Sequence, residues 1–275
     1  MNNSVHISFV NQLSAFAPIT LAEMESIKLM NRIDSKFLTD EFHLQKVLEA
    51  AARAGYRALE TENQRISPYN SVYYDTISLR MFSDHHNKRL VRQKVRTREY
   101  VNSGDVFLEI KRKNNKGRTS KKRISIPKEE LMDFSLDKHA CDYLAEKSWF
   151  HVEELTPILQ TLFSRITLVN PTKTERLTID TNLVFNNFRT GESATLYDAV
   201  IIELKQDGHL NSQMKNILLD YRVKPMRISK YCIAVTLTDS TARSGRFKLK
   251  VRTIEKTINK KITIDNGIIT NNGQL

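Results

Sequence analysis

Six segments of this chain alternate with a period of two residues, and in each the charged residues fall on one face and the apolar residues on the other. An ordinary half-buried strand turns its polar residues toward water, so any one segment is explained by a strand with a solvated basic face. Six such segments indicate instead that the charged faces form one shared surface. These faces are Arg32, Asp34 and Lys36; Lys94, Arg96 and Arg98; Glu109, Lys111 and Lys113; Lys121 and Arg123; Arg176, Thr178 and Asp180; and Glu203 and Lys205.

The strands are expected to be antiparallel neighbours, because turn residues at 102–104 and 114–117 separate some of them. About eight antiparallel strands suffice to close a small barrel. The predicted fold is therefore α+β, with a closed eight-stranded antiparallel barrel flanked by helices. The strands are expected near 31–38, 71–75, 89–100, 106–113, 121–126, 158–170, 175–187 and 197–206, and the helices near 21–30, 40–54, 128–150, 209–221 and 229–237.

One domain is expected over residues 1–238, with its core at about 30–238. Asp40 has the character of a helix N-cap, and Gly55 that of the residue that ends the same helix. After residue 238 the pattern weakens, so we expect a basic tail at 239–275 that forms a weak hairpin or is disordered.

The charge balance predicts an anionic partner. Lys and Arg number 43 against 31 Asp and Glu, a formal charge of +12. Nucleic acid, an anionic membrane and polyphosphate all fit this charge, and so does a simple solvated basic surface. Cations inside a barrel, however, need counter-charges, because burying unpaired ions costs several kcal/mol each. The available carboxylates are too few, so the interior is expected to hold a polyanion; they are Asp34, Glu109, Asp180 and Glu203.

The two cysteines, Cys141 and Cys232, lie far apart in apolar helical patterns, which favours neither a disulfide framework nor a zinc site. No signal-peptide pattern and no apolar run long enough to span a membrane is visible in the sequence. A cytoplasmic protein is therefore expected, with a peripheral membrane location through a separate membrane protein partner as a further possibility.

A divalent metal is expected beside the phosphates, because phosphoryl transfer depends on neutralising charge. Glu203 and Glu109 each stand in a Glu-x-Lys step and are the candidate ligands, with Glu203 favoured. A glutamate among cations can equally serve as an ion-pair partner.

Read in order, these strands resemble the VTC domain, the polyphosphate polymerase domain of the vacuolar transporter chaperone complex, in the triphosphate tunnel metalloenzyme or CYTH-like superfamily. The similar region runs from about residue 30 to 238. The ordered set of motifs is specific, although each alone is weak. The motifs are RIDSKF at 32–37, VYYDT at 72–76, KVRTREY at 94–100, FLEIK at 107–111, SKKRI at 120–124, LTPILQTLFSR at 155–165, RLTIDTNL at 176–183, VIIELK at 200–205 and SKY at 229–231.

The resemblance implies a tunnel that takes a nucleoside triphosphate, moves its terminal phosphate onto a growing chain, and uses Mn²⁺ or Mg²⁺. It implies catalytic roles in phosphate handling for Lys36, Arg96, Arg98, Lys111, Arg165, Arg176 and Lys230, and a metal-binding role for Glu203. Arg165 and Lys230 are found through the resemblance alone. The full predicted phosphate-binding set adds Lys94, Lys121, Arg123 and Lys205.

The first strand departs from the hydrolytic branch of that superfamily, which carries Glu-x-Glu-x-Lys where this chain has Arg32-x-Asp34-x-Lys36. An arginine in place of a carboxylate removes negative charge where a second metal would activate water. This difference favours transfer over hydrolysis.

Three functions remain open from the sequence. The first is a metal-dependent polyphosphate polymerase that uses ATP; the second is a triphosphatase of the same fold. The third is a non-catalytic module that binds polyphosphate or inositol polyphosphate. Nucleic-acid binding is disfavoured, because the basic hairpin at 111–123 lacks interleaved aromatic residues. The oligomeric state is not indicated.

Overall fold

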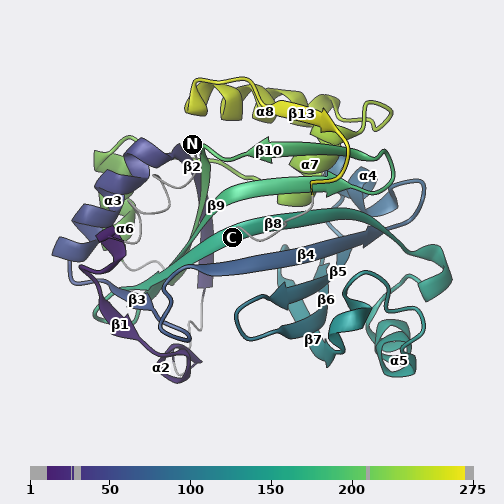
Figure 1. Ribbon diagram of the computed structural model, residues 1–275, viewed down its shortest axis with the longest axis horizontal. Coiled ribbons are helices and arrows are strands. Elements are labelled where there is room, and N and C mark those ends of the chain that lie inside the picture. Colours follow the sequence, from purple (N-terminus) through teal and green to yellow (C-terminus); the bar gives the residue numbers. More distant parts are fainter. Residues whose placement is uncertain (1–10, 26, 28–31, 209–210, 270–275) are drawn as a thin grey trace.

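A large, mainly antiparallel sheet forms the centre of the molecule (Figure 1). The computed structural model describes residues 11–25, 27, 32–208 and 211–269. The main path of the sheet has the order β12-β2-β11-β9-β8-β4-β5-β6-β7. Its strands are β2 (Arg32–Asp40), β4 (Ser67–Asp75), β5 (Arg92–Tyr100), β6 (Asp105–Lys113), β7 (Thr119–Ile126), β8 (Thr156–Val169), β9 (Glu175–Asn187), β11 (Ala199–Asp207) and β12 (Lys224–Pro225).

The predicted α+β class and antiparallel pairing are confirmed, but the closed barrel is wrong for the described part of the chain. There the sheet ends at β12 on one side and at β7 on the other. The free edge of β2 is occupied by β12, where Lys224 pairs with Leu38. The next residue, Met226, donates its backbone N–H to the carbonyl of Lys36 at 2.7 Å. Because this edge is already hydrogen bonded, β7 does not pair with it.

Besides β12, four short strands of the described residues lie outside the predicted set. β1 (Ala17–Ile19) pairs in parallel with β3 (Arg57–Leu59), and β3 also pairs with β8. β10 (Glu192–Leu196) lies between β9 and β13 (Thr263–Asn266). Strands of three to five residues are too short to show a period of two, and pairing with a longer neighbour stabilises them.

One part of the outer face of the sheet is covered by helices α3 (Glu41–Arg53) and α6 (Gln213–Asp220). As predicted, Asp40 caps α3, accepting from the backbone N–H of His43 at 2.8 Å. Gly55 follows the helix with φ at +76°. The predicted starts of the helix at 209–221 and of the first strand at Asn31 lie outside the described residues. Of the helix predicted at 21–30, α2 (Leu21–Glu25) is described, and most of the remainder lies outside the described residues.

The other part of the outer face, over β5 to β7, is covered by the predicted helical insert. It consists of α5 (Lys138–Lys147) between two 3₁₀ turns, η1 (Lys128–Leu131) and η2 (Val152–Glu154). Leu108 and Ile110 of β6 pack there against Phe134 and Leu144. Both cysteines are free, Cys141 in α5 and Cys232 in α7.

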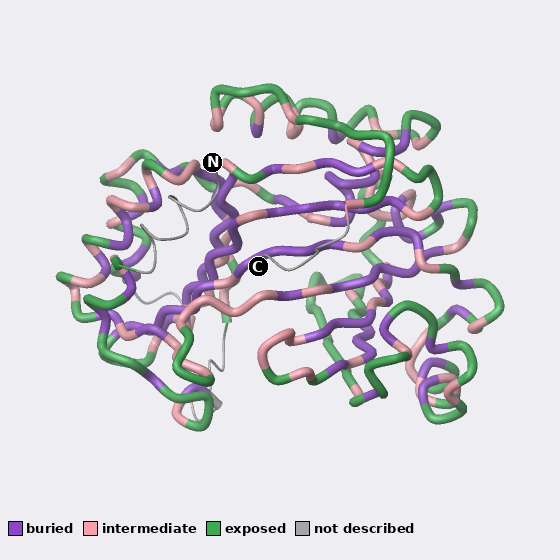
Figure 2. Tube along the Cα trace, in the orientation of Figure 1, coloured by how far each residue is buried: buried purple, intermediate pink, exposed green. Residues whose placement is uncertain are grey.

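Half of the opposite, inner face is covered by helix α7 (Lys230–Thr238), whose Ile233 packs with Leu38 of β2 and Ile201 of β11. Helix α8 (Gly245–Ile258) packs on α7, and α4 (Arg80–His86) lies beside both. The C-terminal segment thus contains a helix and β13 where a weak hairpin or disorder was expected, because Phe247 and Ile254 bury themselves against α7. Figure 2 shows the central strands almost continuously buried and α8 exposed along its outer side.

Candidate phosphate-binding site

The predicted cationic faces lie on one surface, the inner face of the sheet. Strand register shows this directly: Lys36 stands opposite Glu203, and Lys205 lies between Asp34 and Arg176. On the other half of the sheet, one row contains Arg96, Glu109 and Arg123, and the next contains Lys94, Lys111 and Lys121. Since directly opposed residues share a face, the side chains of six strands point to the same side.

The two halves of the sheet approach each other through these side chains although their edge strands are not paired. The Nζ of Lys94 on β5 donates to the Oγ of Ser229, just before α7, at 2.9 Å. The pKa of Lys111 on β6 is lowered to about 8, first by burial and next by the charge of Lys36 on β2. The inner face is therefore concave, with α7 covering its apolar half and the charged residues lining the rest.

Asp180 on β9 anchors the first ion-pair cluster. Arg165 donates to its two oxygens from Nε at 2.6 Å and from an Nη at 2.8 Å, and Lys230 donates to the second oxygen. Burial opposes the charged form, but these two cations hold the pKa of Asp180 well below its usual range. Arg165 also stacks over Tyr69 at 4.8 Å. Asp180 thus fixes the two cations that the strand pattern did not reveal.

Glu109 on β6 anchors a second cluster. Arg96 donates to Oε2 from Nε at 2.7 Å, and Lys121 pairs with Oε1. Burial would raise the pKa of Glu109, but Arg96, Arg98 and Lys121 lower it well below its usual range. Arg96 also donates to the hydroxyl of Tyr73 at 2.9 Å. Burial opposes ionisation of that phenol, yet the cations around it lower the pKa of Tyr73 to about 7.

Glu203 on β11 is held more loosely. Its oxygens lie 3.5 Å from the Nζ of Lys36 and 3.7 Å from that of Lys205. Burial would raise the pKa of Glu203, but the charges of Lys36 and Lys205 lower it to about 2. The carboxylate is therefore ionised at neutral pH with no short hydrogen bond to either lysine.

Several cations of the inner face have no carboxylate partner within the described part of the chain. Arg98 is buried and donates only to the Oγ of Ser71, at 3.0 Å. Lys94 donates to the hydroxyl of Ser229, and the buried Nε of Arg176 has no hydrogen-bond partner in the described ranges. Arg123 donates to the hydroxyl of Tyr100 at 3.3 Å. Buried cations without counter-charge are costly, so the geometry fits an anion with several oxygens.

The expected metal site has to be judged by its donors. Across residues 11–25, 27, 32–208 and 211–269, no group of three or more His, Cys, Asp or Glu side chains could hold a metal. Glu203, whose contacts are long, fits a role as one ligand of a divalent cation that phosphate oxygens would complete, as is common for Mg²⁺. The ion pairs of Glu109 with Arg96 and Lys121 favour a structural role. Both assignments stay predictions.

The sequence interpretation missed Tyr69, Ser71 and Tyr73, which line the inner face from β4. They alternate with a period of two, so the signal was present, but the face carries no charge and did not stand out. It also missed Ser229 as the partner of Lys94.

An antiparallel sheet with a cationic inner wall defines the class of the triphosphate tunnel fold. The chain is similar to HpAC1 from Hippeastrum, a candidate adenylyl cyclase whose structure is described as revealing a dominant triphosphatase activity. The match has a TM-score of 0.51 and 12% sequence identity, and it covers 74% of this chain and 94% of that one. A candidate adenylate cyclase from Vibrio parahaemolyticus matches with a TM-score of 0.43 at 10% identity, covering 73% and 96%. PH1819 from Pyrococcus horikoshii matches with a TM-score of 0.42 at 15% identity, also covering 73% and 96%.

The VTC domain model matches residues 31–239, and the chain belongs to the VTC domain family. A comparison with curated proteins gave no match. Within the described ranges, the helices are all too short or too polar to cross a membrane.

Proposed function

We propose that this domain is a metal-dependent polyphosphate polymerase that transfers the terminal phosphate of ATP to a growing polyphosphate chain. The observation that carries the proposal is the surplus of inner-face cations, among them Lys94 and Arg98, with no carboxylate partner in the described part of the chain. Membership of the VTC domain family supports the same substrate class.

In the proposed step, a terminal oxygen of the chain forms a bond to the γ-phosphorus of ATP. The bond between that phosphorus and the bridging oxygen breaks, and ADP leaves with its electron pair. Little covalent help is needed, so positioning and charge neutralisation decide the rate. Arg98 would hold phosphate oxygens through its free guanidinium N–H groups. A divalent cation held with Glu203 would add positive charge beside the transferred group.

The first strand supports transfer over hydrolysis. The Nε of Arg32 lies 2.6 Å from Oδ1 of Asp34, and an Nη donates to Oδ2 at 3.2 Å. This pair neutralises the carboxylate, so Asp34 is poorly suited to hold a second metal that would activate water.

Hydrolysis of triphosphate is the second candidate, favoured by the structural likeness to HpAC1, whose described activity is dominated by triphosphate cleavage. Binding without turnover is the third, because the same wall can hold a polyanion without a reaction. The three differ in product: a polymer, free phosphate, or neither.

The deciding experiment incubates the purified protein with ATP and Mn²⁺ and measures acid-labile polymer and free phosphate separately. The polymerase proposal expects polymer, and Arg98→Gln should reduce its rate at least about tenfold, because one charge-assisted phosphate contact is lost. Arg98 is the preferred site because its loss leaves no carboxylate unpaired. Free phosphate alone would instead support the triphosphatase.

Arg112→Gln is the matched control. Arg112 lies on β6 but on the outer face, over the ring of Trp149 at 4.8 Å. Its substitution should leave the rate unchanged. Equal losses in both variants would contradict a role for the inner face.

A further inference from the structure

The cationic inner wall continues past the candidate transfer site toward the surface. Beside the row of Lys94, Lys111 and Lys121, strand register places Arg92 directly opposite Lys113. Like charges directly opposed across two strands are destabilising. Lys121 is paired with Glu109, but the other four cations of these two rows have no ion pair to a carboxylate in the described ranges. This surplus indicates that the wall is built for an anion longer than the inner site alone.

Cations from three other segments gather around the same end of β5. The pKa of His85 is lowered to about 3, first by burial and then by the charges of Lys94, Arg92, Lys250 and Lys113. The pKa of Lys250 is lowered by burial and by Arg227 and Lys88. The turn after α4, helix α8 and the segment before α7 therefore bring Lys88, Lys250 and Arg227 close to one another, in agreement with the hydrogen bond from Lys250 to the carbonyl of Arg227.

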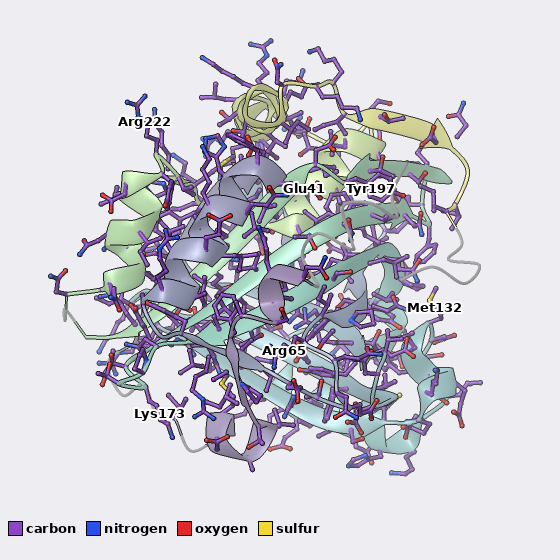
Figure 3. All side chains as sticks on the ribbon, turned by 60° about the vertical axis from the view of Figure 1, so that its left-hand side comes forward. Glu41, Arg65, Met132, Lys173, Tyr197 and Arg222 are labelled. Carbon is purple, nitrogen blue, oxygen red and sulfur yellow. The ribbon has the colours of Figure 1, made fainter. Side chains whose placement is uncertain are left out.

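Helix α8 is held firmly in this place. The backbone N–H and the guanidinium of Arg246 donate to Nε2 and the backbone carbonyl of His86, at 3.3 and 3.2 Å. Phe247 packs edge-on against His85 at 5.9 Å, and Lys250 donates to the backbone carbonyl of Arg227. Figure 3 shows side chains with nitrogen tips projecting from α8 at the top of the view.

We propose that these cations form an outer basic surface that holds the growing polyphosphate chain beyond the transfer site. Its residues are Lys88, Arg92, Lys113, Arg227 and Lys250. Lys94 links it to the inner wall, because it lies two residues from Arg92 on the same face of β5 and stands directly opposite Lys111. The proposal rests on the proposed function for the identity of the chain, and it gives α8, which lies outside the matched residues 31–239, a role.

The test measures binding of two probes, tripolyphosphate and a long inorganic polyphosphate of several tens of phosphates, by calorimetry at several salt concentrations. Arg227→Gln combined with Lys250→Gln should weaken binding of the long probe by about tenfold and lower the slope of log K against log salt by roughly 2, by analogy with phosphate contacts in nucleic acids. Binding of tripolyphosphate should stay unchanged, because it occupies the inner wall.

The matched control is Lys248→Gln combined with Arg252→Gln, two exposed cations on α8 that are turned well away from Lys250 by helical geometry. This control keeps the net charge of the test variant and should bind both probes normally. A second variant, Arg92→Gln with Lys113→Gln, attacks the surface from the sheet and should repeat the loss even if changes in α8 disturb packing.

The proposal is overturned if the test variants weaken both probes alike, weaken neither, or match the control. These readouts need no turnover, so they are separate from the polymerase assay. Length-dependent binding without polymer formation would keep the surface and reject the polymerase.

Discussion

At the scale of single residues, the pKa of the buried Lys230 is subject to two opposed influences. Burial lowers its pKa to about 8, although Asp180 beside it favours the charged form. Lys94 and Lys205 are shifted in the same direction, again mainly by burial. Lys230 and Lys111, whose pKa is likewise lowered to about 8, therefore have charges that are sensitive to pH just above neutrality.

Binding of tripolyphosphate should therefore weaken as pH rises from 7 to 9, because Lys230 loses its proton near pH 8. Calorimetric titration at each pH measures this. Lys230→Gln is the control, since titration of the ligand itself affects both proteins equally. A pH profile identical in the two proteins would contradict the role of Lys230.

The same shift has the opposite effect on the ligand-free protein. Between about pH 8 and the ordinary value of 10.5, the unfolded chain holds a proton on Lys230 that the folded chain has lost. More protons bound in the unfolded state mean that stability rises with pH. The contribution of Lys230 to the free energy of unfolding should therefore increase across this window, as urea unfolding of the wild type and Lys230→Gln would show.

Much of the candidate site follows from the sequence at this scale. Strand periodicity is enough to place Lys36, Arg96 and Lys111 on one face, since the side-chain period of a strand is two. It cannot reach Arg165, because its strand is mostly apolar, or Lys230, because that residue starts a helix. Their partner Asp180 unites them only through tertiary contacts.

At the scale of elements, α7 is fixed to the sheet by a buried carboxylate. Asp75, at the end of β4, accepts from the backbone N–H groups of Met81 and Phe82 at 2.8 and 2.9 Å and from the hydroxyl of Tyr231 at 2.6 Å. One side chain thus joins β4, the start of α4 and the start of α7. Lys230, next to Tyr231, is positioned by the same contact.

Tyr231→Phe should lower the free energy of unfolding by about 1–2 kcal/mol, because a hydrogen bond to a buried carboxylate is lost while the backbone donors remain. Urea unfolding measures this change. Tyr197→Phe is the matched control, since Tyr197, labelled in Figure 3, is partly exposed and lies away from Asp75 in sequence and sheet position. Equal changes in the two variants would show that the Tyr231 hydroxyl contributes nothing.

Most long elements were predictable and the shortest ones were not, with the 14-residue α8 as the exception among the long ones. The nine-residue β5 and the 13-residue α3 carry clear periodicity, and the cap at Asp40 marks where α3 begins. The two-residue β12 carries none, yet it occupies the edge of β2 and leaves the sheet open. Counting strands therefore led to the prediction of a closed barrel, whereas closure depends on which strand edge is already hydrogen bonded.

At the scale of the whole molecule, the ligand-free fold contains more inner-face cations than carboxylates. An anion that binds only the folded state stabilises it by mass action. Tripolyphosphate at about one hundred times its dissociation constant should contribute about 2.7 kcal/mol, which corresponds to a rise of roughly 5 °C in Tm. Differential scanning fluorimetry measures this.

Monophosphate at equal ionic strength is the control for that measurement and should shift the Tm far less, because it cannot span several cations. A rise of the same size with both anions would point to general salt screening rather than to the concave wall.

The open edge of the sheet has a consequence for how the molecule behaves in concentrated solution. β7 is the last strand on its side, and its residues from Thr119 to Arg123 are exposed. Unpaired edges invite strands of other molecules to add to them, and lysines along an edge oppose such growth by mutual repulsion. Lys121, Lys122 and Arg123 line this edge, so charges suited to holding phosphate also keep copies of the chain from joining edge to edge.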